Sequence, residues 1–335
     1  MSDIVPVIDL TDPDAGPALD RAATDLGFFQ IVGHDVDPAL VERLLAALGE
    51  FFRLPQAIKD GYASPAPEVN NGYSAVGAES LAYSLGVEAP PDLFEAMNFG
   101  PEHLDLSDPA VVAERHRLFH PNIWPAEVPM LRELVPDYLS AVRALYRRVT
   151  ELMAQALGLA PGFFDAFGKH PTETLRCNWY ERAAGAPAPL PGQQRMGAHT
   201  DYGILTLLWA DRVPGLELLT KGGDWVGVQP APGAYLVNIG DLLAQWTNDR
   251  WVSTLHRVVP PTSAEGPQLR RSLAYFFDGD WDATFECLPT CCSHERPAKY
   301  APVRAIDHLL NKLVGGRAME LAETTSHVGD RISAV

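Results

Sequence analysis

Two residues at the start of an apolar segment could bind a metal ion together. His199 and Asp201 flank Thr200 at the beginning of a run that predicts a strand over 199–209. Alternate residues of a strand point to the same face, so these two side chains would project together from backbones about 7 Å apart. His256, in a later strand-like segment, is the candidate for a third ligand. The three side chains would then form a facial set around one ion.

The chemistry of such a ligand set is distinctive. Two imidazoles and one carboxylate leave three adjacent octahedral positions open, the arrangement that non-haem Fe(II) oxygenases use for co-substrate and O₂. Zinc prefers four tetrahedral ligands and has no redox role. The His-x-Asp pattern alone is weak, since ten histidines and 43 acidic residues produce about one such pattern by chance. A second instance, His103-Leu104-Asp105, is interpreted as a solvated turn because its surroundings lack strand patterning.

A cationic side chain follows the candidate metal ligands. Arg270 and Ser272 share one face of the strand-like run 270–277, and the Pro-rich turn before it predicts a hairpin between 252–259 and 270–277. An arginine and a hydroxyl on one face can bind a carboxylate, the arginine by a bidentate fork. An Fe(II) ion with these ligands carries about +1, a chelating dicarboxylate 2-oxo acid brings the sum to about −1, and Arg270 returns it to neutral.

Another segment, 173–180, would place Arg176, Asn178 and Tyr180 on one strand face. Alternating polar residues are also typical of a solvated face, so two interpretations stay open. In the functional one, Asn178 and Tyr180 line the co-substrate cavity while Arg176 reaches the substrate. Arg176 would then favour an anionic or amide-bearing small molecule.

The elements that must position these residues differ between the two halves of the chain. Helices are expected from Pro38, with Asp37 as N-cap, to about residue 52, and over about 137–157. Residues 63–127 are rich in Pro, Gly, Asn and Asp and predict long loops with short helices. Strands are expected at 5–10, 27–34, 173–180, 199–209, 215–219, 224–228, 234–239, 252–259 and 270–277. Short strands at this spacing indicate a sandwich or jelly roll.

Composition disfavours several classes of protein. The chain has 335 residues, of which 47% are hydrophobic, and 26 basic against 43 acidic residues give a net charge of −17. That charge disfavours a nucleic-acid partner, because phosphate backbones are bound by clustered Lys and Arg. No apolar stretch suits a membrane span, and no secretory signal is visible. Because the four cysteines form neither a zinc nor a disulfide framework, we expect a reduced cytoplasmic enzyme with a small-molecule substrate, monomeric or weakly homo-oligomeric.

Ordered motifs along the chain match a known family. They are Val5-Pro6-Val7-Ile8-Asp9-Leu10, Gly27-Phe28-Phe29-Gln30-Ile31-Val32-Gly33-His34, Asn71-Gly72-Tyr73, Leu175-Arg176-Cys177-Asn178-Trp179-Tyr180, His199-Thr200-Asp201-Tyr202-Gly203, Asn238-Ile239-Gly240-Asp241, Trp246-Thr247-Asn248-Asp249, Ser253-Thr254-Leu255-His256-Arg257-Val258 and Arg270-Arg271-Ser272. Together they resemble the isopenicillin N synthase-like, non-haem Fe(II) and 2-oxoglutarate-dependent dioxygenases over nearly the whole chain. The resemblance implies a mainly β fold with flanking helices and a double-stranded β-helix (jelly-roll) core. The expected layout is an N-terminal dioxygenase region at 1–120, scaffold helices at 121–165, the oxygenase core at 166–285, and a tail helix with a substrate-side cover at 286–335.

The resemblance also implies roles for the candidate residues. The metal ligands would be His199, Asp201 and His256, and the 2-oxoglutarate contacts would be Arg270, Ser272 and Tyr180, with Asn178 nearby. The implied enzyme uses O₂ and 2-oxoglutarate to oxidise an unactivated C–H bond, by hydroxylation, desaturation or ring closure, and releases succinate and CO₂; ascorbate would keep the iron reduced. Asp201, where halogenases have Gly or Ala, resembles hydroxylating members. A longer turn between His256 and Arg270, and Glu181 in place of the common Pro after Tyr180, depart from the family pattern but remove no required group.

Substrate contacts and three alternative functions complete the expectations. The substrate cavity would be lined from the 63–105 loops, the tail beyond 285 and the core, with candidate contacts Arg176, Tyr73, Phe94, Asn98, Phe99, Trp209 and Phe276. The first alternative is an Fe(II) oxidase like isopenicillin N synthase, which uses O₂ without 2-oxoglutarate and binds substrate carboxylate at Arg270 and Ser272. The others are a metal-free or zinc-holding jelly roll that acts as a binding module, and a nucleic-acid repair oxygenase, which the net charge of −17 disfavours.

Overall fold

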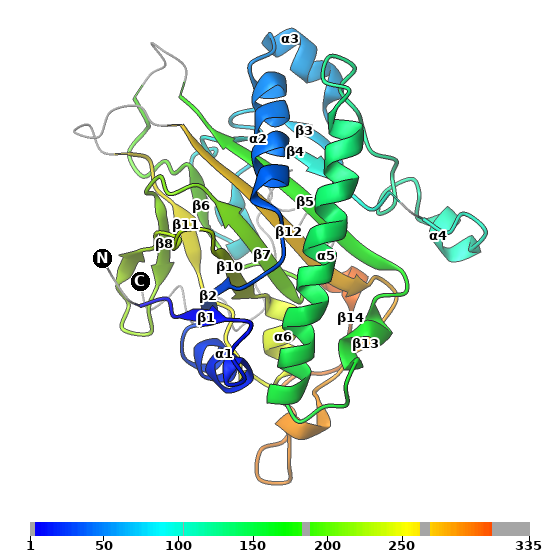
Figure 1. The fold of residues 1–335 in the computed structure, drawn as a ribbon, viewed down its shortest axis with the longest axis vertical. Coiled ribbons are helices and arrows are strands. Elements are labelled where there is room, and N and C mark those ends of the chain that lie inside the picture. The colour runs from blue at the N-terminus through cyan, green and yellow to red at the C-terminus, as the bar shows by residue number, and fades with distance from the viewer. Residues whose placement is uncertain (1–3, 103, 183–187, 262–268, 310–335) are drawn as a thin grey trace.

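The computed structural model describes residues 4–102, 104–182, 188–261 and 269–309. Two β-sheets form its centre, and three helices cover the outer face of the larger sheet (Figure 1). These are α1 (Ala15–Asp25), α2 (Pro38–Phe52) and α5 (Leu131–Ala156). The shorter helices are α3 (Gln56–Lys59), α4 (Pro109–Ala113) and α6 (Asp241–Trp246), with 3-10 turns at Asp60–Tyr62, Leu81–Leu85, Phe163–Phe167 and Pro289–Cys291.

The larger sheet has eight strands in the order β1-β2-β10-β7-β12-β5-β4-β3. They are β1 (Val7–Asp9), β2 (Phe28–Val32), β3 (Gly72–Ser74), β4 (Glu95–Phe99), β5 (Pro171–Tyr180), β7 (Leu205–Ala210), β10 (Tyr235–Ile239) and β12 (Arg270–Asp280). The β1–β2 pair is parallel, and the other neighbours run antiparallel. Strands β1 to β4 come from the N-terminal region, so that region contributes to the same sheet as the oxygenase core.

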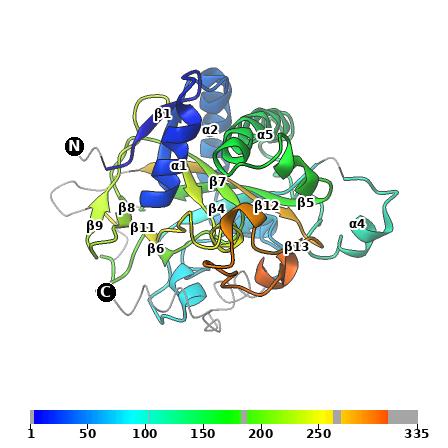
Figure 2. The same cartoon turned by 90° about the horizontal axis from the view of Figure 1, so that it is seen from below.

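The smaller sheet has four strands in the order β6-β11-β8-β9. They are β6 (Met196–His199), β8 (Leu216–Leu219), β9 (Trp225–Gly227) and β11 (His256–Val258). Figure 2 shows this sheet on the side of the larger sheet that the helices leave uncovered. A separate two-stranded pair is formed by β13 (Thr284–Phe285) and β14 (Val303–Arg304). Two sheets packed in this way confirm the predicted jelly-roll core with flanking helices.

Two apolar cores hold these layers together. The larger core joins α1, α2 and α5 to the outer face of the eight-stranded sheet, through buried residues such as Leu44, Leu139 and Tyr275. The smaller core lies between the two sheets and includes Phe28 and Val258. One face of the large sheet therefore packs against helices, and part of its other face, toward the small sheet, is available for a site.

The helix predictions agree with the structure, with one shift of boundary. Helix α2 begins at Pro38, and the Asp37 side chain accepts a 2.9 Å hydrogen bond from the Ala39 amide, as the N-cap prediction requires. Helix α5 begins at Leu131, six residues before the expected start. The helix includes Pro136 in its second turn, where the missing amide of proline removes only one helical hydrogen bond.

The predicted hairpin between 252–259 and 270–277 is wrong. Strand β11 pairs with β6 and β8 in the small sheet, whereas β12 pairs with β5 and β7 in the large one. The segment between them therefore connects the two sheets, as jelly rolls require. A Pro-rich turn shows that the chain reverses, but it does not show which strand becomes the neighbour.

Two other segments differ from expectation. The strand predicted over 199–209 is two strands, because β6 ends at His199 and β7 begins at Leu205. The break is fixed at Gly203, where an added Cβ would lie 1.9 Å from Oδ1 of Asp278. The region 63–127 contains β3 and β4 as well as loops. Most of the predicted tail helix falls in 310–335, outside the described residues. No helix in the described part of the chain has the length and apolarity to cross a membrane.

Candidate metal centre and adjoining cleft

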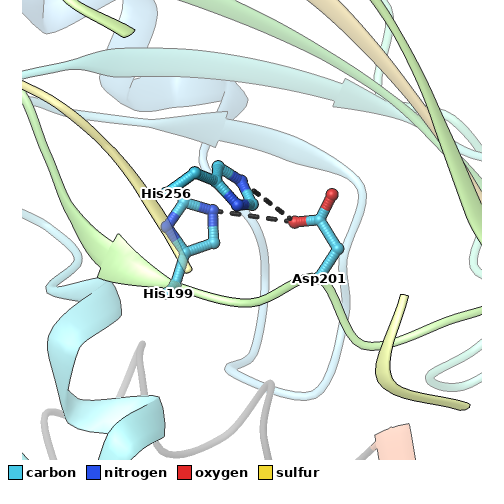
Figure 3. Close-up of side chains that lie close together, drawn as sticks. All are labelled: His199, Asp201 and His256. Atoms are coloured by element: carbon cyan, nitrogen blue, oxygen red, sulfur yellow. Dashed lines mark ion pairs between the residues drawn. The ribbon is translucent and has the colours of Figure 1, made fainter. Parts of the chain in front are cut away.

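The three predicted metal ligands lie together between the two sheets. His199 and His256 are direct cross-strand partners at the ends of β6 and β11. Asp201 comes from the loop after β6, and its Oδ1 lies 3.6 Å from Nε2 of each histidine (Figure 3). The ligand atoms of all three residues lie within 4.8 Å of one another. The expected convergence is therefore present, but a loop and a cross-strand pair produce it, not alternation along one strand.

Hydrogen bonds hold each ligand in an orientation suited to a metal ion. Nδ1 of His199 lies 2.8 Å from the Gly197 carbonyl, and Nδ1 of His256 lies 3.1 Å from the Thr254 carbonyl. A carbonyl only accepts, so Nδ1 carries the proton of each ring and Nε2 offers its lone pair to a metal. Because both Nε2 atoms face Asp201, the protein fixes the tautomers that binding needs.

The carboxylate of Asp201 is held in the same manner. Its Oδ2 accepts a 2.5 Å hydrogen bond from Oγ1 of Thr206 and a 2.6 Å bond from Nδ2 of Asn238. These donors leave Oδ1 for the ion. Asn238 belongs to a motif that the sequence singled out, but neither residue was assigned a role there. No sequence signal identified Thr206, because its proximity to Asp201 depends on the loop after β6.

The surroundings of His199 favour the neutral imidazole that a metal ion requires. Burial and, to a smaller extent, the neighbouring His256 lower the pKa of His199 to about 3, although Asp201 opposes the shift. The imidazole of His199 is therefore neutral near pH 7, as a metal ligand must be. In the part of the chain that the structure describes, these three residues are the only group of histidine, cysteine or acidic side chains close enough together to hold a metal ion. Of the second His-x-Asp instance, His103 lies outside the described residues, and Asp105 is exposed in a turn with Ser107.

A cleft that is partly open to solvent adjoins the three ligands. The predicted co-substrate residues line it, because Arg270 pairs with Tyr180 and Ser272 pairs with Asn178 across β12 and β5. Nδ2 of Asn178 lies 3.2 Å from Oγ of Ser272, and the guanidinium carbon of Arg270 lies 5.0 Å from the centre of the Tyr180 ring. The strand alternation that predicted a shared polar face is confirmed.

Arg270 fits an anionic ligand. Its side chain is only 2% exposed, and among the described residues its Nε and Nη1 have no hydrogen-bond partner. A buried guanidinium without a partner is costly, and a carboxylate is the group that satisfies its planar donors. The donor set beside it, two imidazoles and one carboxylate, suits Fe(II). The residues present therefore fit both the metal ion and a 2-oxo acid.

Arg176 lines the cleft but does not offer a free charge. Its Nη2 donates a 2.8 Å bond to Oε2 of Glu79, its Nε donates a 3.0 Å bond to Oδ1 of Asn178, and its guanidinium carbon lies 5.0 Å from the Phe94 ring centre. Glu79 is itself buried and accepts a 2.6 Å bond from Ser74. Arg176 was expected to favour an anionic or amide-bearing substrate, and its pairing with Glu79 leaves no free charge there for an anionic one. Nothing in the sequence marked Glu79 among 43 acidic residues as the partner.

The remaining predicted substrate contacts divide into two sets. Asn98 and Phe276 line the cleft with Arg176. Four aromatic residues lie outside that lining, namely Tyr73, Phe94, Phe99 and Trp209. The hydroxyl of Tyr73 donates to Glu95, and Phe99 stacks on Trp124 in the helix-side core. Phe99 and Trp209 point away from the cleft because side chains alternate along a strand, and their neighbours Asn98 and Leu208 point into it.

The structure also brings an acidic residue into the cleft that the sequence did not suggest. Asp278 lies on β12, eight residues after Arg270, and lines the same cavity. Burial raises its pKa to about 7, and the nearby carboxylate of Asp201 adds to the rise. Asn98 offers the cleft a second polar group, because its Oδ1 is buried without a hydrogen-bond partner among the described residues.

Comparison with known proteins agrees with this site. A family model of the N-terminal region of non-haem dioxygenases in morphine synthesis matches residues 5–127, and the 2OG-Fe(II) oxygenase superfamily model matches residues 171–279. Validamycin A dioxygenase from Streptomyces hygroscopicus subsp. limoneus is 36% identical over 294 residues, which cover 84% of this chain and 79% of that protein. The 2-oxoglutarate-Fe(II) type oxidoreductase hxnY from Emericella nidulans is 35% identical and covers 84% of this chain, with 78% of that protein covered.

A solved structure gives the same result. The crystal structure of a full-length Neurospora crassa protein in complex with alpha-KG and thymine matches with a TM-score of 0.80 and 28% identity, covering 93% of this chain and 96% of that one. The match to relatives that use 2-oxoglutarate favours the 2-oxoglutarate-dependent reading over the oxidase that works without it. With the family models, the identities and the fold in agreement, the chain belongs to the 2OG-Fe(II) oxygenase superfamily.

Proposed function

We propose that this enzyme uses Fe(II), 2-oxoglutarate and O₂ to hydroxylate an unactivated C–H bond of a small molecule, with succinate and CO₂ as the other products. One observation carries the residue assignment. Arg270, whose buried guanidinium has two nitrogens without a partner among the described residues, lines the same cleft as His199, Asp201 and His256. A place for an anion and a place for a metal ion therefore share one cavity.

In this assignment each group has a defined task. His199, Asp201 and His256 would hold Fe(II), while Arg270, Ser272 and Tyr180 would hold 2-oxoglutarate. When bound, the iron and the 2-oxo acid supply the oxidising power taken from O₂. Ascorbate would keep the iron in its reduced state.

The chain's own residues position the co-substrate. The amide of Asn178 donates to Oγ of Ser272, so the hydroxyl proton of Ser272 stays free to donate to a carboxylate. The Tyr180 ring lies beside the Arg270 guanidinium and restricts where it can move. Apolar side chains line the surrounding wall and limit access of water, namely Met196, Leu208, Leu216 and Val258. In such surroundings the Arg270–carboxylate pair is stronger than in water.

The substrate would occupy the rest of the cleft, near Asn98 and Phe276. Two relatives support a small polar molecule as the class. One is named for validamycin A, and the other was solved with thymine. Hydroxylation is proposed in preference to halogenation because the carboxylate of Asp201 is present beside the two histidines.

The experiment compares two aspartates that occur in the same sequence pattern. Wild-type protein, Asp201→Ala and Asp105→Ala are supplied with Fe(II), ascorbate, 2-oxoglutarate and a library of small polar metabolites, and succinate release is measured. Asp105→Ala should behave as wild type, because Asp105 is exposed in a turn. Asp201→Ala should lose turnover and keep its circular-dichroism spectrum. Succinate release by Asp201→Ala would remove Asp201 from the metal site.

We also propose a cellular location, an oligomeric state and the absence of a nucleic-acid partner for the enzyme. It would act in the cytoplasm as a monomer or weak homo-oligomer, without a nucleic-acid partner. Support comes from four free cysteines and from the net charge of −17. Light scattering across a concentration series tests the oligomeric state, and binding assays with DNA and RNA at low salt test the partner.

A further inference from the structure

One strand carries opposite charges at the two ends of the cleft. Alternate residues of β12 line it in a row, namely Arg270, Ser272, Ala274, Phe276 and Asp278. Next to Asp278 in this row, Phe276 pairs across the sheet with Thr206, the residue that holds Asp201. At about 3.3 Å per residue, Arg270 and Asp278 are roughly 26 Å apart along the strand. A five-carbon diacid bound at Arg270 is much shorter than this distance, so Asp278 lies in the part of the cleft left for the substrate.

Asp278 has no partner for its carboxylate. The residue is 9% exposed, and none of the described residues donates a hydrogen bond to it or forms an ion pair with it. Its Oδ1 lies against Gly203, in the loop that carries Asp201, and the charge of Asp201 has the same sign. A buried carboxylate is costly unless a cation or several donors reach it. The position of Asp278 in the cleft means that a ligand can provide them.

Apart from Glu68, which is exposed to solvent, the other charges of the cleft are paired or assigned. Arg176 pairs with Glu79, and Glu173 pairs with Arg143. Arg270 is assigned to 2-oxoglutarate, and Asp201 to the metal ion. Among the described lining residues, Arg176 and Arg270 are the only arginines or lysines. Among the described lining residues the substrate side therefore has no free cation, whereas the buried carboxylate of Asp278 and Oδ1 of Asn98 are acceptors.

From this arrangement we infer that the substrate carries a positively charged nitrogen, an amine or a guanidine, which binds to Asp278. This inference rests on the proposed function, because it takes Arg270 to be occupied by 2-oxoglutarate. Asn98 supplies a second acceptor for a nitrogen-bound hydrogen or a hydroxyl of the same molecule. A substrate carboxylate is disfavoured in this part of the cleft, because it would face Asp278 without a cation to offset the repulsion.

The test uses three small probes that share a ring and differ in charge. They are cyclohexylamine, cyclohexanol and cyclohexanecarboxylate, titrated into anaerobic protein loaded with Fe(II) and 2-oxoglutarate. Binding is measured by ligand-observed NMR, with displacement between probes to confirm a common site. A charged hydrogen bond should make the amine bind at least about tenfold more tightly than the alcohol, with the carboxylate weakest. Equal affinities of amine and alcohol, or no binding of the amine, would overturn the inference.

Substitution of Asp278 gives the second comparison. Asp278→Asn keeps the shape and should reduce the affinity for the amine by about tenfold, to that of the alcohol, while leaving the alcohol unchanged. Asp278→Ser is a second variant with a smaller side chain and the same expected loss. The matched control is Asp282→Asn, an exposed aspartate four residues along the chain, which should bind all three probes as wild type does. An undiminished preference for the amine in both Asp278 variants would contradict the inference.

The same samples separate this inference from the proposed function. The visible absorption band of the Fe(II)–2-oxoglutarate complex reports co-substrate binding, and Asp278→Asn should retain it. A normal band with no preference for the amine would overturn only the inference about the substrate. Absence of the band in the wild-type protein would overturn the proposed function, together with the inference that depends on it.

Discussion

The amide of Asn238 donates a 2.6 Å hydrogen bond to Oδ2 of Asp201, while Oδ1 of the same carboxylate faces the two histidines. Asn238 lies on β10 of the large sheet, and His199 and His256 lie on the small sheet. The bond therefore connects the two sheets through Asp201, the candidate metal ligand on the loop after β6. It also explains why a loop residue can hold a defined orientation: its second oxygen is fixed by the rigid sheet.

Removal of this bond should weaken metal binding without removing a ligand. Asn238→Ala is expected to reduce Fe(II) affinity by about 10- to 100-fold, the usual effect of losing a group that orients a ligand. Anaerobic calorimetric titration with Fe(II) measures the change. Gln229→Ala, which alters an exposed amide, is the control. An Fe(II) affinity of Asn238→Ala equal to that of the control would mean that Asn238 does not orient Asp201.

Two adjacent arginines on β12 provide a test variant and a matched control for co-substrate binding. Arg270→Ala should weaken 2-oxoglutarate binding by about 2–5 kcal/mol, because the ligand carboxylate loses its buried partner. Arg271 points to the opposite face, where its Nε lies 3.3 Å from Oδ2 of Asp211, so Arg271→Ala should bind 2-oxoglutarate normally. Equilibrium binding of 2-oxoglutarate to both variants decides the assignment. It would be wrong if Arg270→Ala kept wild-type affinity.

The buried pair of Arg176 and Glu79 should be important for stability. Glu79→Gln leaves the Arg176 guanidinium buried without its charged partner, so the free energy of unfolding is expected to fall by about 3–5 kcal/mol. Asp35→Asn removes the carboxylate of an exposed ion pair with Arg148 and should cost no more than about 1 kcal/mol. Urea denaturation measures both. Equal losses in the two variants would show that burial does not strengthen the Arg176 pair.

Asp92 predicts a pH dependence of stability. Burial raises its pKa to about 7, although the Leu81 and Gly197 amides and Arg176 oppose the rise and Glu79 adds to it. Because the folded pKa lies above the unfolded one, the folded state binds more protons, and stability should fall as pH rises from about 4 to about 7. Asp92→Asn resembles the protonated form. It should match wild type near pH 4 and exceed its free energy of unfolding above pH 7, by up to about 4 kcal/mol.

The measurement for Asp92 is the difference between the two unfolding free energies across this pH range, since contributions of other groups cancel in the difference. A difference that does not change with pH would show that Asp92 does not titrate in this range. A difference that grows as pH falls would contradict the sign of the shift.

Local patterns in the sequence predicted which residues share a strand face, but they did not predict which strands pair. Alternation along 173–180 and 270–277 placed Asn178, Ser272 and Arg270 correctly, because a strand's side-chain period does not depend on its neighbours. The hairpin prediction failed because pairing partners are set by the whole sheet. The sequence named His256 as the candidate third ligand, but its contact with His199 requires β6 and β11 to meet, which no local pattern could show.

Buried polar partners could not be predicted for a related reason. Glu79 and Asn238 are far from Arg176 and Asp201 along the chain, and many residues of the same types are present. The aromatic residues expected to contact the substrate show a different difficulty, because a sequence does not distinguish an aromatic side chain of the core from one that lines a cleft. Tyr73, Phe99 and Trp209 pack away from the cleft, because a large aromatic side chain gains more from burial in a core than from a partly polar cavity.

Anaerobic titration of the Fe(II)-loaded protein with 2-oxoglutarate tests the central claim most directly. Direct chelation of the iron by the 2-oxo acid should produce a weak visible charge-transfer band in the wild-type protein that saturates with one equivalent of 2-oxoglutarate. The band should be absent in Asp201→Ala and should need far more 2-oxoglutarate in Arg270→Ala. Iron binding without any band in the wild-type protein, or an unchanged band in Asp201→Ala, would contradict the account.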